Sequence, residues 1–128
     1  MITTGVDIVK ISRIKDILNK NSQSFYKKIF NKEEIEYIKG KSYNPRTVAG
    51  LFASKEAVSK ALGTGIGKVK WKDIKVLHDS NGKPYIRLSD NVNDILNDLK
   101  INKFDISISH EDEYAIAFVI AYYDLNIK

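Results

Sequence analysis

Two carboxylates and a lysine are the residues of this sequence best suited to metal and phosphate chemistry. Asp7 interrupts an apolar run at residues 6–9, and burying a carboxylate there costs free energy unless it is paired or binds a metal. Glu56 and Lys60 are four residues apart, so a helix places them on one face, where Glu56 could hold a cation and Lys60 could meet a phosphate. The simpler alternatives are an aspartate facing water at a strand edge and an ordinary surface ion pair.

Two further segments could contact a ligand. A glycine-rich stretch at residues 63–67 follows the helix that carries Glu56, whereas the usual phosphate-binding loop precedes a helix. It is therefore either a helix stop or a place where a ligand approaches the backbone closely. His110 follows Ser107 and Ser109 at the end of a predicted strand, but no nucleophile-elbow sequence accompanies them, which argues against a serine hydrolase.

The composition favours a soluble globular protein with an anionic partner. The chain has 128 residues, 43% of them apolar, and a net charge of +5, so we expect a single domain over residues 1–128. It has no cysteine, which excludes disulfides and thiolate metal sites. No apolar run is long enough to span a bilayer, and a cytoplasmic protein is expected. So small a domain has a modest core, which oligomerisation would supplement.

Local sequence signals predict the elements that position these residues. Hydrophobic periodicity predicts helices over residues 12–20 and 24–30, with Ser12 as the first N-cap. Asn31 and Glu34 resemble a capping box that begins a helix ending at Gly40, and Asn44-Pro45 begins a helix that Gly63 ends. A further helix is expected over residues 90–100, and strands over residues 2–9, 70–77, 84–88, 104–109 and 114–123. This order predicts an α+β fold, with a small, mostly antiparallel sheet packed with helices.

One segment suggests a different function. Residues 68–72 alternate lysines with Val69 and Trp71, a pattern that would suit a basic RNA-binding module. Ordinary strand alternation, with Val69 and Trp71 facing the core and the lysines in water, explains the same pattern more simply.

Taken together, the motifs resemble one family, the holo-acyl-carrier-protein synthases, which are short bacterial 4′-phosphopantetheinyl transferases. The resemblance runs in order along nearly the whole chain, and its most specific part is the early glycine-x-aspartate combined with the lysine–glutamate helix. The matching segments are residues 5–9 (GVDIV), 12–14 (SRI), 52–65 (FASKEAVSKALGTG), 81–84 (NGKP), 107–110 (SISH) and 114–115 (YA).

The resemblance implies a reaction, a fold and roles for particular residues. The phosphopantetheine arm of coenzyme A moves to a serine of apo-acyl carrier protein, and adenosine 3′,5′-bisphosphate leaves. Asp7 and Glu56 match the Mg²⁺ ligands and Lys60 matches a phosphate-stabilising residue, so these three are the expected catalytic residues. Arg13 matches a basic position that docks the acidic carrier protein. The expected coenzyme A contacts are Lys60, Gly63, Gly65, Gly82, Lys83, Pro84 and His110.

The family also implies an assembly, and the chain departs from the family at one position. Short members are trimers with active sites between subunits, which implies a cytoplasmic homotrimer in fatty acid biosynthesis without nucleic-acid or membrane partners. Many members carry arginine where this chain has Leu51, which puts one phosphate contact in doubt, although Arg46 could substitute. A non-catalytic coenzyme A binder is therefore the other alternative. The general base stays open among Glu56, a metal-bound water and another carboxylate.

Overall fold

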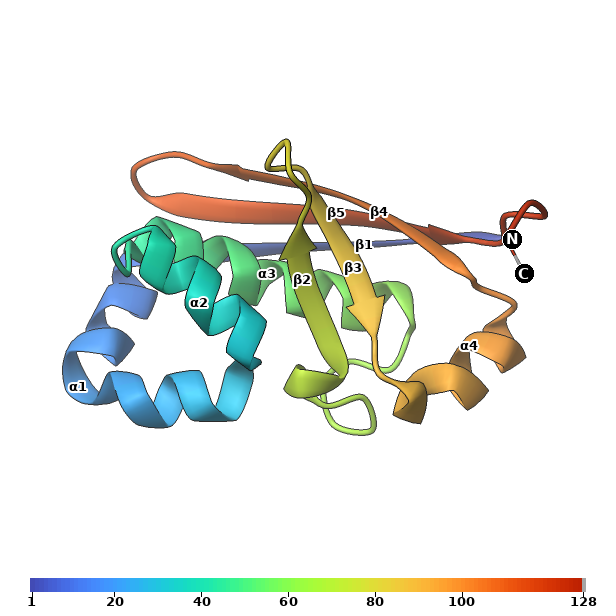
Figure 1. Cartoon of the computed structure of the whole chain (residues 1–128), viewed down its shortest axis with the longest axis horizontal. Coiled ribbons are helices and arrows are strands. Elements are labelled where there is room, and N and C mark those ends of the chain that lie inside the picture. The colour runs from blue at the N-terminus through green and yellow to red at the C-terminus, as the bar shows by residue number, and fades with distance from the viewer. Residues whose placement is uncertain (128) are drawn as a thin grey trace.

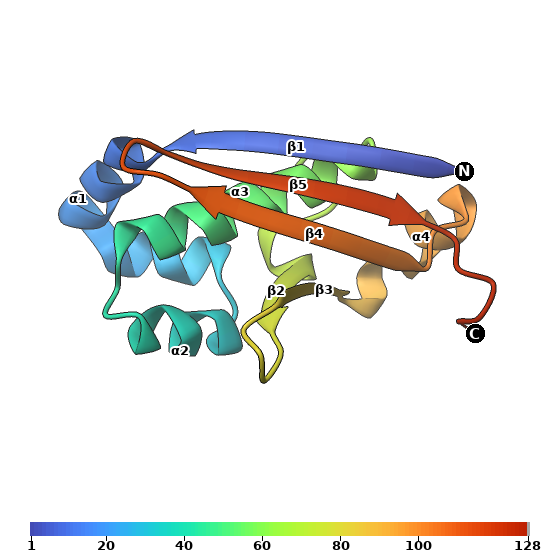
Figure 2. The same ribbon diagram turned by 90° about the horizontal axis from the view of Figure 1, so that it is seen from above.

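A three-stranded antiparallel sheet forms one layer of the structure, a computed structural model that describes residues 1–127. The strands are β1 (Ile2–Lys10), β5 (Tyr114–Tyr122) and β4 (Lys103–His110), side by side in that order (Figure 2). The central strand β5 turns alternate residues toward the helices, and these are mostly small: Ala115, Ala117, Val119 and Ala121 are fully buried. Small side chains on this face allow a helix to approach the sheet closely.

That helix is α3 (Pro45–Ala61), which carries Glu56 and Lys60. It begins as predicted, because the side chain of Asn44 accepts a hydrogen bond from the Arg46 amide at 3.0 Å and Pro45 occupies the first turn. It crosses beneath the sheet, with Gly50 against Ile108 of β4 and Ala57 against Gly5 of β1. The buried apolar residues of all these layers form one core.

Helices α1 (Ile11–Ile29) and α2 (Lys32–Gly40) lie at one end of the molecule (Figure 1). The two helices predicted over residues 12–20 and 24–30 are both present, as the two halves of α1 on either side of a kink at Asn21, whose φ and ψ are −159° and 77°. The predicted N-cap at Ser12 is wrong. The helix begins at Ile11, directly after β1, and the Ile11 amide donates to the Glu113 carbonyl at 2.8 Å instead of to a capping side chain.

The remaining elements form a second layer. Strands β2 (Ile74–His78) and β3 (Pro84–Leu88) pair as an antiparallel hairpin, followed by a 3-10 turn at Asp90–Val92 and α4 (Asn93–Leu99). The prediction of a strand from residue 70 is wrong for its first part. Trp71–Asp73 form a 3-10 turn, in which the Asp73 carboxylate accepts a hydrogen bond from the Lys70 amide at 2.9 Å. Within residues 1–127, no helix is long and apolar enough to cross a membrane.

Candidate active site

Gly5 determines how closely α3 approaches the strand that carries Asp7. A Cβ atom built at Gly5 would lie 1.9 Å from the Ala57 carbonyl oxygen and 2.8 Å from the Ala61 nitrogen. No side chain larger than hydrogen fits there unless the two backbones move apart. Because side chains alternate along a strand, Asp7 points to the same face as Gly5, toward the C-terminal half of α3.

This close approach brings Asp7 and Lys60 together. The Lys60 Nζ lies 3.0 Å from Asp7 Oδ1 and 3.1 Å from the Val6 carbonyl oxygen. The Asp7 side chain is 16% exposed, while that of Lys60 is 50% exposed. Asp7 is therefore a partly buried carboxylate facing a helix, and the simpler alternative of a water-facing strand-edge aspartate is wrong.

Glu56 belongs to the same cluster. Burial raises the pKa of Glu56, the neighbouring Asp7 carboxylate raises it further, and the cations Lys60 and Arg13 lower it. Arg13 is exposed on α1, so a cationic side chain lies at the rim of the cluster. The structure thus gathers Asp7, Glu56 and Lys60, three residues from two elements, with Arg13 beside them.

The donor set of this cluster fits Mg²⁺. Among residues 1–127, no group of three or more histidine, cysteine, aspartate or glutamate side chains could hold a metal alone. Mg²⁺ does not need such a group, because it commonly takes one or two carboxylates and completes its shell with water and substrate phosphates. Asp7 and Glu56 would supply those two carboxylates. A divalent cation would also relieve the repulsion that contributes to the raised pKa of Glu56.

The glycine-rich stretch ends α3 next to this cluster. Gly63 and Gly65 have φ angles of 75° and 63°, which favour glycine. Their amides donate to the carbonyls of Lys60 and Ser59 at 3.0 Å and 3.2 Å, so they close the helix and are not free to bind an anion. Nothing lies within 4 Å of a Cβ built at either glycine, which leaves the Cα face of the turn open.

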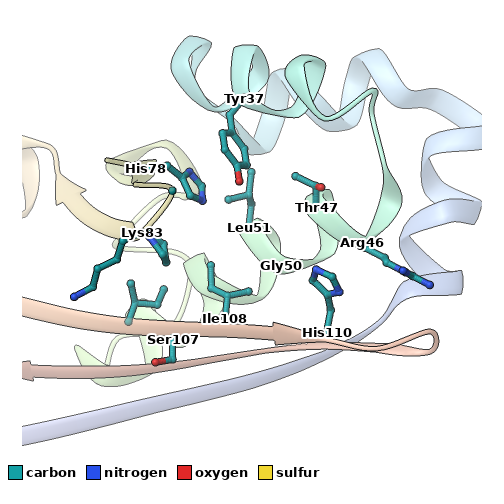
Figure 3. Close-up of a pocket in the computed structure, with 13 residues that line it drawn as sticks. Tyr37, Arg46, Thr47, Gly50, Leu51, His78, Lys83, Ser107, Ile108 and His110 are labelled. Carbon is teal, nitrogen blue, oxygen red and sulfur yellow. The ribbon is translucent and has the colours of Figure 1, made fainter. Parts of the chain in front are cut away.

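The other expected coenzyme A contacts line a separate cavity of about 420 Å³ (Figure 3). Its walls come from α2, α3, the β2–β3 hairpin and β4. Its lining includes Arg46, Lys83 and His110, whose side chains are cationic or titratable, and the apolar residues Leu51 and Pro84. Such a cavity suits a ligand that combines phosphates with a flat apolar group.

The hairpin that presents Lys83 is shaped by Asp79 and Gly82. Asp79 Oδ1 accepts hydrogen bonds from the amides of Asn81 and Lys83 at 2.8 Å and 2.9 Å, and Gly82 has a φ of 82°. The predicted hairpin is therefore present. Its turn is not the two-residue type usual for Asn-Gly, because only the glycine of that pair has a positive φ.

Several cavity residues escaped the sequence analysis. Tyr37 and His78 line the cavity and stack in parallel, with ring centroids 3.7 Å apart and an interplanar angle of 2°. They belong to different elements, so no local pattern could pair them. Asp112, in the β4–β5 turn outside the cavity lining, was also missed; its exposed carboxylate forms an ion pair with the guanidinium of Arg46 at 2.5 Å, while Leu51 is buried.

The two groups of residues occupy opposite edges of the sheet. Asp7 lies on β1 and His110 on β4, with β5 between them and α3 beneath (Figure 2). The residues lining the cavity of Figure 3 include neither Asp7, Glu56 nor Lys60. Within one chain, the carboxylate cluster and the cationic cavity are thus two separate groups of residues.

Comparison with known proteins identifies the family. A model of the 4′-phosphopantetheinyl transferase superfamily matches residues 3–119. Over 117 residues the chain is 50% identical to the holo-[acyl-carrier-protein] synthase of Alkaliphilus metalliredigens, covering 91% of this chain and 95% of that protein. The fold is similar to that of the Neisseria meningitidis holo-[acyl-carrier-protein] synthase, with a TM-score of 0.86, 35% identity, and 94% of this chain and 98% of that one covered. It is also similar to the Helicobacter pylori enzyme in complex with coenzyme A, with a TM-score of 0.81, 36% identity, and 92% and 98% covered. These matches confirm the resemblance seen in the sequence: the chain belongs to the 4′-phosphopantetheinyl transferase superfamily.

Proposed function

We propose that this protein transfers the 4′-phosphopantetheine arm of coenzyme A to a serine of apo-acyl carrier protein, for fatty acid biosynthesis in the cytoplasm. The serine oxygen forms a bond to the phosphorus of the arm, the phosphoanhydride bond breaks, and adenosine 3′,5′-bisphosphate leaves. The observation that carries this proposal is the cluster of Asp7, Glu56 and Lys60 in a chain whose relatives are named for this reaction.

The cluster residues have distinct roles in this reaction. Asp7 and Glu56 would hold Mg²⁺, which when bound supplies positive charge to the pyrophosphate and helps to orient the hydroxyl. The Lys60 ammonium, 3.0 Å from Asp7, is half-exposed and able to reach a phosphate oxygen as a second positive charge. Gly63 and Gly65 end the helix so that the Cα face of the turn beside Lys60 stays open to coenzyme A.

The cavity of Figure 3 would bind the nucleotide part of coenzyme A. Arg46, Lys83 and His110 are its candidate phosphate contacts, and Gly82 and Pro84 shape the hairpin wall. Arg46 would supply the guanidinium that Leu51 lacks, since it lines the same cavity in spite of its unfavourable spacing along the sequence.

The carboxylate cluster and the cationic cavity would each form half of one active site, and we call them half-sites. A second copy of the chain would be needed to bring the two half-sites together. One copy would place its β1 edge, with Asp7 and Glu56, against the β4 edge of the next copy, and a cyclic trimer repeats this contact three times. The outer face of the sheet supports such an assembly, because it exposes a stripe of large apolar side chains: Ile2, Val6, Ile8, Tyr114, Ile116 and Phe118.

The carrier protein would dock beside the carboxylate cluster. Arg13 is exposed on α1 and close enough to Glu56 to lower its pKa, so an acidic carrier bound at Arg13 would present its serine near the metal-binding carboxylates. Lys10, Lys15 and Lys20 are exposed along the same segment and extend this positive surface.

A transfer assay tests the proposal directly. Purified protein is incubated with coenzyme A, Mg²⁺ and apo-acyl carrier protein, and the carrier is weighed by mass spectrometry. We expect the mass of the arm to be added, and to be absent with chelator or with a carrier whose acceptor serine is alanine. Glu56→Ala should abolish transfer yet keep the fold, whereas Glu36→Ala, on the exposed face of α2, should change neither.

The alternatives predict different results in the same experiment. A non-catalytic coenzyme A binder would show a thermal shift with coenzyme A but no transfer with several apo carriers. An RNA-binding module would show salt-sensitive RNA binding and no such shift. An argument against the RNA alternative is that Trp71 already stacks on Phe52, with ring centroids 4.9 Å apart.

A further inference from the structure

A fully buried ion pair lies between α2 and α3, apart from both half-sites. Glu34 and Lys55 are each 0% exposed, and Lys55 Nζ lies 2.8 Å from Glu34 Oε1. The ammonium also donates to the carbonyl oxygens of Trp71, at 2.9 Å, and Ile74. All three N–H donors of the lysine are therefore used.

The carboxylate of Glu34 is satisfied just as fully. Its Oε1 accepts from the Asn31 amide at 2.8 Å, which is the predicted capping contact, as well as from Lys55. Its Oε2 accepts from the Val76 amide of β2 at 2.9 Å. The sequence predicted the cap, but not that the same carboxylate also binds a strand.

Together the two side chains occupy the edge of β2 that faces away from β3. Residues two apart in a strand present their backbone groups to the same side, so the Ile74 carbonyl and the Val76 amide point toward the ion pair. No strand of the described residues pairs with β2 on that side. Glu34 and Lys55 bind the backbone there as a neighbouring strand would, which matters because an isolated two-stranded hairpin is only marginally stable.

The hairpin attached in this way carries one wall of the coenzyme A cavity. Its turn presents Gly82, Lys83 and Pro84, while His78 at the end of β2 stacks on Tyr37 of α2. The other walls are α2 and α3, the two helices that bear Glu34 and Lys55. The ion pair therefore joins three of the four elements whose separation sets the width of the cavity (Figure 1).

We propose that Glu34 and Lys55 are positioning residues for coenzyme A: their buried pair fixes the β2–β3 hairpin against α2 and α3 and so keeps the nucleotide cavity at its binding width. This inference rests on the proposed function. Weakening the pair should raise the KM for coenzyme A and leave kcat and the KM for the carrier protein nearly unchanged, since none of the pair's polar contacts involves Asp7, Glu56 or Lys60.

The test compares Glu34→Gln with Glu33→Gln. Glu33 is a matched control, because it pairs with Lys75 at 3.2 Å and so also links α2 to β2, but on the exposed surface. We expect Glu34→Gln to raise the KM for coenzyme A about tenfold with kcat within twofold, and Glu33→Gln to change neither more than twofold. A fall in kcat at constant KM would overturn the proposal, and so would lowered thermal stability with unchanged kinetics.

A measurement on the wild-type protein covers the case in which Glu34→Gln does not fold. Without coenzyme A, the Val76 amide should exchange with solvent only through global unfolding, because the pair already holds β2 in place. Fast local exchange of Val76 that coenzyme A suppresses would show that the ligand, not the ion pair, fixes the hairpin. If the wild type transfers no arm, the proposed function fails, and Val76 exchange still decides whether the pair fixes the hairpin.

Discussion

Replacing Gly5 by alanine tests whether close packing of α3 on β1 assembles the carboxylate cluster. The added Cβ would lie 1.9 Å from the Ala57 carbonyl oxygen, and real Cβ contacts below 3.0 Å essentially do not occur, so the backbones must separate by about 1.1 Å. The obstacle is helix backbone rather than a flexible side chain, so the separation would move the backbone of α3, which carries Glu56 and Lys60, away from β1, which carries Asp7.

The expected cost of this change falls on both stability and catalysis. Overpacking of a tight interior contact typically costs about 1–3 kcal/mol of the free energy of unfolding. For a domain of this size, that lowers the melting temperature by roughly 3–5 °C per kcal/mol. A displacement of about 1 Å in a catalytic group can reduce turnover about 100-fold. We therefore expect Gly5→Ala to fold with a lowered melting temperature and to lose about two orders of magnitude in kcat.

Two other glycines provide graded controls for this measurement. Gly40→Ala adds a Cβ with nothing within 4 Å, so its melting temperature and transfer rate should match the wild type. Gly50→Ala places a Cβ 3.1 Å from the Ile108 Cγ2, a side-chain atom that can move, and should have a smaller effect than Gly5→Ala. Calorimetry and steady-state transfer kinetics measure all three. Wild-type kcat in Gly5→Ala, at any melting temperature, would refute the reasoning.

Three further predictions concern the surfaces around the site. Phe118→Asp should convert the assembly to monomers in light scattering and abolish transfer, because it places a charge on the exposed apolar face of the sheet; an unchanged mass would contradict the proposed interface. Arg13→Glu should raise the KM for the carrier protein about tenfold at low salt, less at high salt, and leave the KM for coenzyme A unchanged. The pKa of His78 lies below 6.5, chiefly because of burial and then because of the charge of Lys41, while Asp79 raises it. The imidazole of His78 therefore takes up a proton less readily in the folded state than in the unfolded state. The contribution of neutral His78 to the free energy of unfolding is therefore complete above pH 6.5 and is lost as the pH falls through its lowered pKa. His78→Phe should reduce the dependence of the free energy of unfolding, measured with denaturant, on pH over this range, and an unchanged pH dependence would contradict the assignment.

Elements decided by local chemistry were predictable from the sequence. The start of α3 at Asn44-Pro45 and the hairpin around Asn81-Gly82 depend on residues next to each other in the chain, and both are present. The start of α1 was not predictable, because the Ile11 amide is satisfied by the distant Glu113 carbonyl. The prediction of where β2 starts was wrong for a similar reason. The Asp73 carboxylate, which shapes the 3-10 turn before β2, accepts a hydrogen bond from the distant Ser89 hydroxyl at 2.6 Å as well as from the Lys70 amide.

The residues of the site likewise divide into those that the sequence could predict and those that depend on distant contacts. Spacing alone favoured a surface ion pair between Glu56 and Lys60, but Lys60 contacts Asp7, because a helix–strand approach allowed by Gly5 cannot be inferred from helical periodicity. The family resemblance did indicate that Asp7 and Glu56 act together. The helix predicted from Pro45 to Gly63 already contained Arg46, Glu56 and Lys60, but neither source indicated that Arg46, in the first turn of α3, lines a cavity separate from the cluster near its end.

This placement on α3 makes the proposed sharing of sites between subunits measurable. In a cyclic assembly, the last turns of α3 in one copy and the first turn of α3 in its neighbour contribute to the same site. A Glu56→Ala chain then retains a working cavity, and an Arg46→Ala/His110→Ala chain retains a working carboxylate cluster. Neither variant alone forms a complete site.

Mixing the two variants should therefore restore activity. When equal amounts are unfolded and refolded together, each site takes its cluster from one chain and its cavity from another at random, so about one quarter of the sites combine two intact halves. At a coenzyme A concentration far below the KM of the cavity variant, we expect about 25% of wild-type transfer activity from the mixture. Activity no greater than the mean of the separate variants would mean that each site is built within one chain, and the proposed trimeric site would be wrong.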